Sequence, residues 1–99
     1  MVRYIRDKNI EKKIIDYLSK KGAKKIEIFG SYARGEEYND IDILVEFEKW
    51  PDLITFIGYK LDLEDRIGKK IDLIAGKEAI SKYVWPYVMK DLKELYERR

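Results

Sequence analysis

Three aspartates beside apolar runs are the residues of this sequence best suited to chemistry. Asp40 and Asp42 stand two positions apart in "DIDILVEF", and Asp72 lies in the similar run "KKIDLIAG". Because residues two apart on a strand project from one face, Asp40 and Asp42 present their carboxylates together. Carboxylates that close repel each other unless a cation or a shared proton joins them. The spacing therefore predicts a Mg²⁺ site, because Mg²⁺ takes oxygen ligands from carboxylates and from substrate phosphates.

A glycine–serine pair precedes these aspartates and provides a place for phosphate. Gly30 permits a sharp turn and a close approach of phosphate to the backbone, and we expect Ser31 to cap a short helix over "SYARG". Free N–H groups at such a helix start attract anions. Arg34 can add charge to that phosphate or pair with Glu36 or Glu37.

Each of these features also has a purely structural explanation. A Gly-Ser turn by itself is usually only a turn, Asp40 can cap a strand edge, and Asp72 can pair with Lys69 or Lys70. The hypothesis of a metal–nucleotide site rests on the combination. If the strand of Asp72 lies next to that of Asp42, three carboxylates converge in the geometry of a two-metal site.

Composition limits which other chemistries are open to the chain. The 99 residues include no cysteine and no histidine, which excludes disulfides, thiolate sites and imidazole bases. The net charge of +2 comes with no basic stripe, so neither DNA nor RNA is an expected partner. No apolar segment reaches the length of a membrane span, and the N-terminus has no signal core. We expect one cytoplasmic domain over residues 1–99.

Hydrophobic periodicity predicts the elements that must position these side chains. It predicts an α+β fold, with a small mixed β-sheet of about three strands and helices packed mainly on one face. The expected helices cover 8–21, 52–68 and 78–99, the last of them broken near Pro86, and the expected strands cover 24–30, 40–47 and 69–76.

The same patterns assign faces and helix ends. In 40–47 the predicted core face carries Ile41, Ile43, Val45 and Phe47. The first helix should begin at Asp7 or Asn9 and stop at Gly22, and the second should stop at Gly68. The residues expected to be buried in these two helices are Ile10, Ile14, Ile15 and Leu18 in the first, and Leu53, Phe56, Ile57, Leu61 and Leu63 in the second.

The order "FGSYARG" then "DIDILVEF" resembles the signature of the DNA polymerase beta-like nucleotidyltransferases, and more narrowly of the minimal nucleotidyltransferase (MNT) group. The resemblance covers essentially the whole chain and implies the nucleotidyltransferase fold. In that family a Gly-Ser pair binds the nucleoside triphosphate, a D-x-D pair binds Mg²⁺, and a third acid assists the attacking hydroxyl. By match of motif these roles fall on Gly30, Ser31, Asp40, Asp42 and Asp72. Arg34 is a candidate for the phosphate from its position near the turn, and the motif does not assign it.

The loop before the D-x-D pair is where this sequence departs from the family. Eight residues separate Ser31 from Asp40. The family more often has about ten there. Asn39 also stands where the family commonly has serine.

The resemblance also implies a partner and a reaction. Members of the MNT group are often encoded beside a HEPN toxin, a small helical ribonuclease, and transfer AMP from ATP to one of its tyrosines, with Mg²⁺, expected here as two ions. We expect the same antitoxin reaction, with Tyr83, Trp85 and Tyr87 as candidates for a partner or homodimer surface and core packing for at least one of them. Two alternatives stay open: a non-enzymatic nucleotide-binding module, and transfer to a small molecule or an RNA end.

Overall fold

The computed structural model of the chain describes residues 6–98, so residues 1–5 and 99 of the expected domain lie outside the described part. Along the chain the elements are α1 (Lys8–Lys20), β1 (Ala23–Phe29), α2 (Gly30–Ala33), β2 (Asp40–Phe47), α3 (Leu53–Ile67), β3 (Lys70–Ala75), the 3₁₀ turn η1 (Lys77–Ala79), α4 (Trp85–Asp91) and β4 (Lys93–Glu97). None of the helices in residues 6–98 combines the length and the apolarity needed to cross a bilayer.

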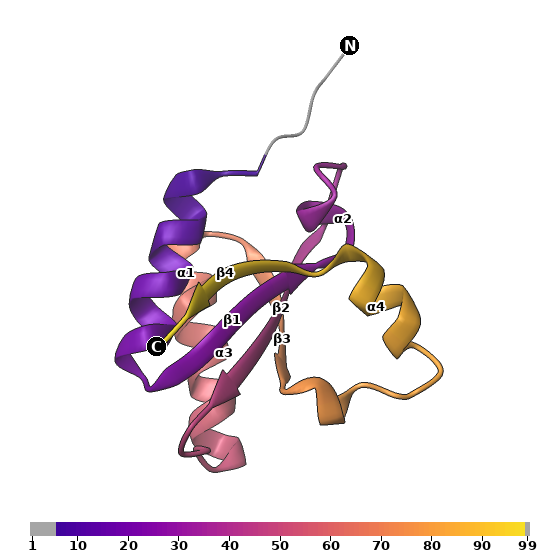
Figure 1. Cartoon of the computed structure of the whole chain (residues 1–99). Coiled ribbons are helices and arrows are strands. Elements are labelled where there is room, and N and C mark those ends of the chain that lie inside the picture. The colour runs from indigo at the N-terminus through magenta and orange to yellow at the C-terminus, as the bar shows by residue number, and fades with distance from the viewer. Residues whose placement is uncertain (1–5, 99) are drawn as a thin grey trace.

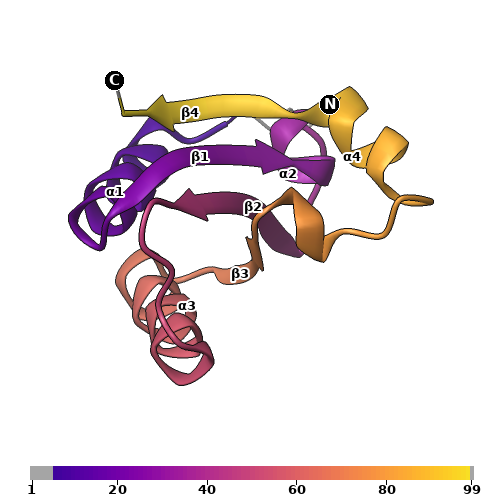
Figure 2. The same ribbon diagram turned by 60° about the horizontal axis from the view of Figure 1, so that its bottom comes forward.

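The strands form one mixed sheet in the order β3-β2-β1-β4 (Figure 2). Strands β1 and β2 are antiparallel, β1 and β4 are antiparallel, and β2 and β3 run parallel through the crossover helix α3. A parallel neighbour needs such a crossover, because a tight turn can only reverse the chain. The expected mixed sheet is confirmed, with four strands where the sequence predicted about three.

The extra strand corrects the prediction for the C-terminal segment. As predicted, a helix begins near Pro86, which stands in the first turn of α4. The expected helix over the rest of 78–99 is wrong: η1 covers only Lys77–Ala79, and the chain after α4 forms β4. Strand β4 pairs with the open edge of β1, where Tyr96 lies opposite Ile26. Sheet hydrogen bonds and the packing of Tyr96 against the core outweigh the helical propensity of this segment.

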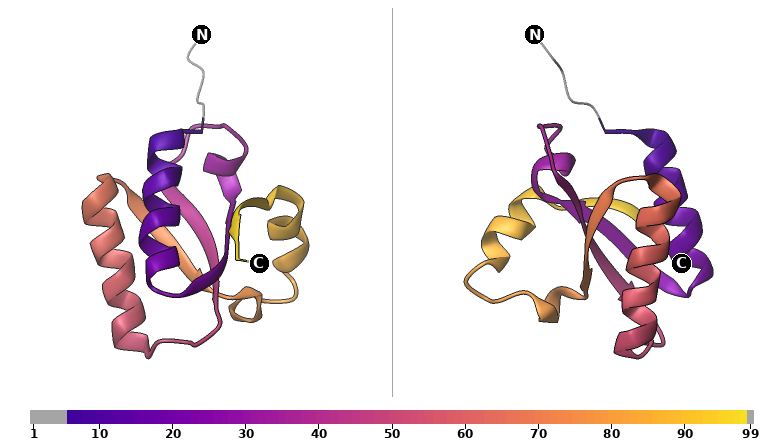
Figure 3. Two further views of the ribbon diagram at one scale, coloured as in Figure 1. Left: turned by 60° about the vertical axis from the view of Figure 1, so that its left-hand side comes forward. Right: turned by 180° about the vertical axis from the view of Figure 1, so that it is seen from behind.

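Helices α1 and α3 lie side by side over one face of the sheet, and α4 lies across the other (Figures 1 and 3). The predicted core face of β2 is confirmed, because Ile41, Ile43, Val45 and Phe47 are almost completely buried beneath α1 and α3. A smaller cluster on the opposite face joins Phe29, Leu44 and Val88 of α4. The helices therefore pack mainly on one face, as expected.

Helix α1 is anchored at both ends as the sequence predicted. The Asp7 carboxylate accepts hydrogen bonds from the backbone N–H groups of Asn9 and Ile10, at 2.8 and 3.2 Å. The helix ends just before Gly22, which has a positive φ of 96°. Of the four residues predicted to be buried, Ile14 and Leu18 are fully buried and Ile10 and Ile15 are half-buried. Tyr17 and, unexpectedly, Glu11 are also buried, with 7% and 8% exposure.

The buried set predicted for α3 is largely wrong. Leu63 is completely buried and Phe56 packs partly against the core, but Leu53, Ile57 and Leu61 are exposed, Leu53 by 71%. Besides the contacts of Phe56 and Tyr59 with Phe47 of β2, the helix lies at the β3 edge of the sheet and packs against α1 and β3. The side of α3 that faces away from both of them therefore keeps its apolar residues exposed, which is unusual for a surface helix.

Candidate active site

The sheet brings two of the predicted acids together at the ends where β2 and β3 begin. In the parallel pairing of these strands Asp42 stands opposite Asp72, and Asp40 stands opposite Lys70. Asp42 is half-buried, and Asp40 and Asp72 are exposed. The condition set by the sequence, that the strand of Asp72 lies next to that of Asp42, is met.

Gly30 lies against the carboxylate of Asp42. Phe29, the last residue of β1, is paired with Asp42 across the antiparallel ladder, and Gly30 follows with a φ of 76°. A Cβ atom at position 30 would overlap Oδ2 of Asp42, and the positive φ would itself strain any side chain. Glycine is therefore required here both by the turn and by the room that the Asp42 carboxylate takes.

The environment of Asp42 disfavours its charged form. Burial, followed by the charges of Asp72 and Asp40, raises the pKa of Asp42 from the ordinary 3.8 to about 6, against a smaller opposing effect of Arg34. Within residues 6–98 no three acidic side chains lie close enough together to form a metal-binding group. Asp42 and Asp72 are thus the adjacent pair of oxygen donors, with Asp40 close enough to act on Asp42 by its charge.

Arg34 leaves the end of α2 and is held by two carboxylates. Its guanidinium pairs with Glu36, with Nε to Oε1 at 3.1 Å, and with Asp91 at the end of α4. The pairing with Glu36 is one of the two roles that the sequence allowed. Asp91 had no signal in the sequence, because it lies 57 positions further along the chain.

Ser31 stands in the first turn of α2, directly after Gly30. The expected cap by its hydroxyl is wrong, because α2 follows Phe29 with no side-chain cap. Helix α2 is a single turn, in which the N–H of Arg34 donates to the Gly30 carbonyl and that of Glu36 donates to the Ser31 carbonyl. The Ser31 hydroxyl is therefore not committed to a helix cap.

A buried hydrogen-bond network, which was not predicted from the sequence, holds this turn against α1. The hydroxyl of Tyr32 donates to Glu11 at 2.8 Å and accepts from the N–H of Asp7 at 2.8 Å. Arg6 donates twice to the same Glu11 carboxylate, at 2.8 Å each. A signal was available, since Glu11 stands three residues before Ile14 on the apolar side of the helix, where an unpaired charge would be costly.

The geometry suits a ligand that is both anionic and metal-bound. A partly buried carboxylate that has a raised pKa and a carboxylate neighbour is stabilised when a hard cation binds it, because the cation favours the charged form. The backbone turn at Gly30 lies against that same carboxylate. A phosphate at the turn and a cation at Asp42 would be in immediate contact.

Comparison with known proteins gives relatives of the same size class. A protein of Methanocaldococcus jannaschii, which carries the provisional name of a protein adenylyltransferase, is 48% identical over 67 residues, 66% of this chain and 72% of the relative. The protein adenylyltransferase MntA of Thermococcus cleftensis is 47% identical over 55 residues, 54% of this chain and 56% of that protein.

Solved structures with the same fold come from toxin–antitoxin complexes. A toxin–antitoxin structure with AMP-PNP has a TM-score of 0.75 and 28% identity, over 90% of this chain and 74% of that one. The MNT antitoxin bound to a tri-AMPylated HEPN toxin of Shewanella oneidensis has a TM-score of 0.72 and 26% identity, over 90% and 71% of the two chains.

A family model settles the class of the enzyme. The model for the polymerase beta nucleotidyltransferase domain matches residues 12–99, which include every element from most of α1 onward. With the relatives above, this match shows that the chain belongs to the polymerase beta nucleotidyltransferase family and is a nucleotidyltransferase.

Proposed function

We propose that this nucleotidyltransferase transfers AMP from ATP to a tyrosine hydroxyl of a HEPN-type toxin, with Mg²⁺, and so acts as the antitoxin of a cytoplasmic pair. The observation that carries the proposal is the Asp42 carboxylate, which lies between the Gly30 turn and Asp72 and has a pKa of about 6. This arrangement supports a site for a metal-bound triphosphate and has no evident structural use.

The residues would divide the work as follows. The backbone at Gly30 and the hydroxyl of Ser31 bind the triphosphate, because they form the turn that lies against Asp42. Asp42 and Asp72 would hold Mg²⁺, expected as two ions, with Asp40 adding negative charge nearby. The metal would neutralise phosphate charge and help to orient the α-phosphate.

The transfer exchanges one bond to phosphorus for another. The acceptor oxygen forms a bond to the α-phosphorus, the bond from that phosphorus to the bridging oxygen breaks, and pyrophosphate leaves. The hydroxyl proton passes to a carboxylate, for which Asp72 is the exposed candidate beside Asp42. Catalysis then consists mostly of positioning and charge neutralisation.

We propose that a partner protein brings the acceptor to the site, and exposed aromatic side chains near α4 offer a surface for it. Two exposed aromatic side chains, Tyr83 and Tyr87, stand on or just before α4 at 76% and 72% exposure, and Trp85 packs inward against the small cluster. Asp91, at the end of the same helix, is paired with Arg34. The name of the Thermococcus relative and the Shewanella complex both support a protein as acceptor.

The direct test compares Asp42→Asn with Asp65→Asn, which removes the same charge from an exposed position on α3. Each variant is incubated with Mg²⁺, labelled ATP and the proposed HEPN-type toxin, and the mass of the toxin is measured by mass spectrometry. We expect one or more AMP additions with the wild type and Asp65→Asn, and a loss of at least about 100-fold with Asp42→Asn. Full transfer by Asp42→Asn would refute the assignment of the site.

The same experiment separates the alternatives. Mg²⁺-dependent ATP binding with an unmodified but inhibited toxin would favour the non-enzymatic module. AMP transfer that needs a small molecule or an RNA end in place of the toxin would identify a different acceptor for the same site.

A further inference from the structure

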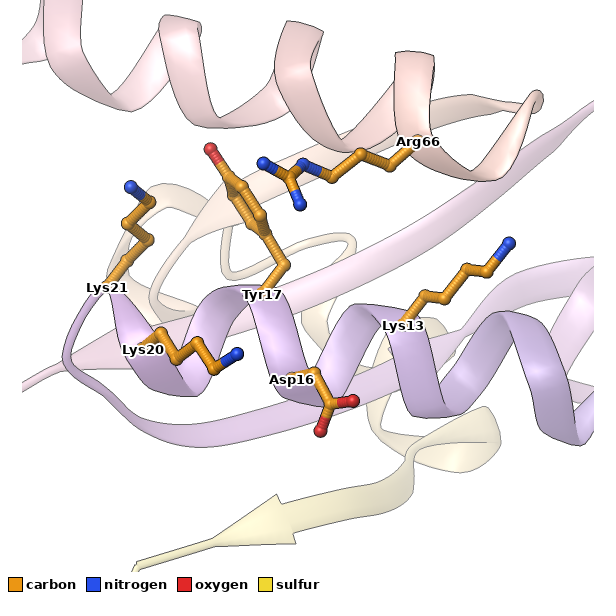
Figure 4. Close-up of a pocket in the computed structure, with 6 residues that line it drawn as sticks. All are labelled: Lys13, Asp16, Tyr17, Lys20, Lys21 and Arg66. Atoms are coloured by element: carbon orange, nitrogen blue, oxygen red, sulfur yellow. The ribbon is translucent and has the colours of Figure 1, made fainter.

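A second concave site lies between α1 and α3, and none of its residues belongs to the candidate active site. It is a cavity of about 590 Å³, drawn in Figure 4. The residues that line it are Lys13, Asp16, Tyr17, Lys20, Lys21 and Arg66. A volume of this size falls within the range of small-ligand sites.

The lining is strongly basic. Four of the six residues are cationic, and Asp16 is the acid among them. Arg66 forms an ion pair with Asp62, with its Nε 3.6 Å from Oδ2. Among the described residues the lysine ion pairs are those of Lys25 and Lys60, so the lysines of the cavity keep their charges uncompensated by ion pairs. Such a concentration of uncompensated positive charge attracts anions.

The ring of Tyr17 offers a ligand little exposed surface. Tyr17 is only 7% exposed, and the ammonium of Lys21 and the guanidinium of Arg66 stand on either side of its ring, 5.3 and 5.0 Å from the centroid (Figure 4). A nucleobase therefore cannot stack on this ring, and a partner protein would find no apolar anchor at the centre. The cationic groups of the lining are therefore what a ligand would recognise in this cavity.

The spacing of the lysines indicates the form of the anion. Lys13 and Lys20 are seven residues apart on α1, which places their positions about 10 Å apart along the helix axis. That length exceeds a single phosphate and suits several in a row. Ammonium groups on flexible stems bind phosphate oxygens as point charges without a fixed geometry.

We propose that this groove is an anion site for a run of adjacent phosphate groups, as in a polyphosphate chain or a nucleic-acid backbone. It binds phosphates directly through lysines, whereas the candidate active site needs a metal to hold phosphates beside aspartates. The two sites therefore differ in their dependence on Mg²⁺, and this proposal stands or falls independently of the adenylyltransferase function.

The test uses two probes in EDTA, so that no metal can hold phosphate at Asp42. The probes are a short fluorescein-labelled single-stranded RNA, followed by anisotropy, and sodium tripolyphosphate, followed by calorimetry and by competition with the RNA. The groove variant is Lys13→Gln/Lys20→Gln/Lys21→Gln. The control variant, Lys49→Gln/Lys82→Gln/Lys90→Gln, removes the same charge from exposed positions outside the groove.

We expect the groove variant to weaken binding at least tenfold and the control to weaken it less than twofold. We also expect the slope of log affinity against log salt to fall by about 2 with the groove variant, because each phosphate contact to a single strand contributes about 0.7. If the RNA binds and tripolyphosphate displaces it, the ligand is a nucleic-acid backbone. If tripolyphosphate binds and the RNA does not, the ligand is a free polyphosphate.

Three results would overturn the proposal. The first is that neither probe binds at low salt. The second is that the groove variant and the control variant weaken binding equally, which would mean diffuse attraction by net charge. Equal competition by a polyglutamate peptide would show that the groove does not select phosphate. Thermal melts of both variants serve as the folding control, since all six lysines are exposed.

Discussion

Glu11 and Asp42 are both partly withdrawn from water, and their surroundings are opposite. Glu11 in α1 is 8% exposed and is satisfied by Arg6 and Tyr32. Asp42 in β2 is half-buried, with Asp72 as its neighbour across the sheet and Gly30 against its oxygen. Both carboxylates lose hydration, but only Glu11 receives hydrogen bonds that replace it.

The difference shows in the direction in which the pKa of each carboxyl shifts from its ordinary value. Burial raises the pKa of Glu11, but hydrogen bonds from Arg6 and Tyr32 outweigh it, so the net pKa is lowered. At Asp42, burial and the neighbouring acids act in the same direction and raise the pKa. The hydrogen bonds of Glu11 favour its charged form in the folded state. Asp42 lacks such bonds and lies beside other acids, which is the pattern expected of a functional site.

The largest effect should come from filling the space beside Asp42. Gly30→Ala strains the positive φ and drives a methyl group into the carboxylate, so we expect a loss of AMP transfer of at least about 100-fold. We also expect a loss of about 2–4 kcal/mol in the free energy of unfolding, measured by urea denaturation.

Gly68→Ala is the matched control, because Gly68 also has a positive φ but has open space around it. It should cost only the backbone strain, about 1 kcal/mol, with transfer activity retained. Equal losses of activity in the two variants would show that contact with Asp42 is not what requires Gly30.

Next in size is the removal of the satisfied carboxylate. Glu11→Ala leaves the buried Tyr32 hydroxyl without its acceptor and frees Arg6, so we expect a loss of about 2–3 kcal/mol in urea denaturation. Asp16→Ala, at an exposed position of the same helix, should stay within about 0.5 kcal/mol. A neutral Glu11→Ala would mean that the network contributes nothing to stability.

At Asp42 we expect removal of the charge to stabilise the fold, the opposite of the effect at Glu11. Its folded pKa of about 6 lies above the ordinary 3.8, so its charge destabilises the fold as pH rises through that interval. In EDTA at pH 7, Asp42→Asn should therefore be more stable than the wild type by about 1–2 kcal/mol, after allowance for partial solvent screening. The gain should vanish below about pH 4, where the carboxyl of Asp42 is protonated in both the folded and the unfolded wild type. A destabilised Asp42→Asn at pH 7 would contradict an unsatisfied Asp42.

The smallest effect is the pH dependence of the Glu11 network. Glu11→Gln keeps an acceptor for Tyr32 but loses the charge that Arg6 binds, so it should be about 1 kcal/mol less stable at pH 7. Because the folded pKa of Glu11 is lowered, its advantage is present above the ordinary 4.5 and is lost as pH falls through the folded value. Denaturation curves of the two proteins should converge in acid; a gap that widens there would reverse the assigned sign.

Much of the fold was readable because alternation along a strand is local. The run "DIDILVEF" places Ile41 and Ile43 in the core and Asp42 on the other face by period alone, and the structure agrees. The last segment was not readable, because the partner of β4 is β1, which precedes it by more than sixty residues. The exposure of one side of α3 could not be predicted either, because its apolar pattern predicts burial but does not say where the sheet ends.

The acidic candidate active site and the basic cavity also differ in how far the sequence alone predicts them. The sequence already paired Asp40 with Asp42 and placed Gly30 before them. It showed no basic stripe, because Arg66 joins the lysines of α1 only when α3 folds back beside that helix.

By itself the sequence determined the strands, the acidic face of β2, the turn at Gly30 and the resemblance to a nucleotidyltransferase, since these depend on neighbours a few residues apart. Only the tertiary structure decided that Asp72 stands opposite Asp42, that Glu11 is satisfied by Arg6 and Tyr32, and that β4 completes the sheet. Register, burial and charge pairing depend on segments that are distant along the chain, so no local pattern carries them.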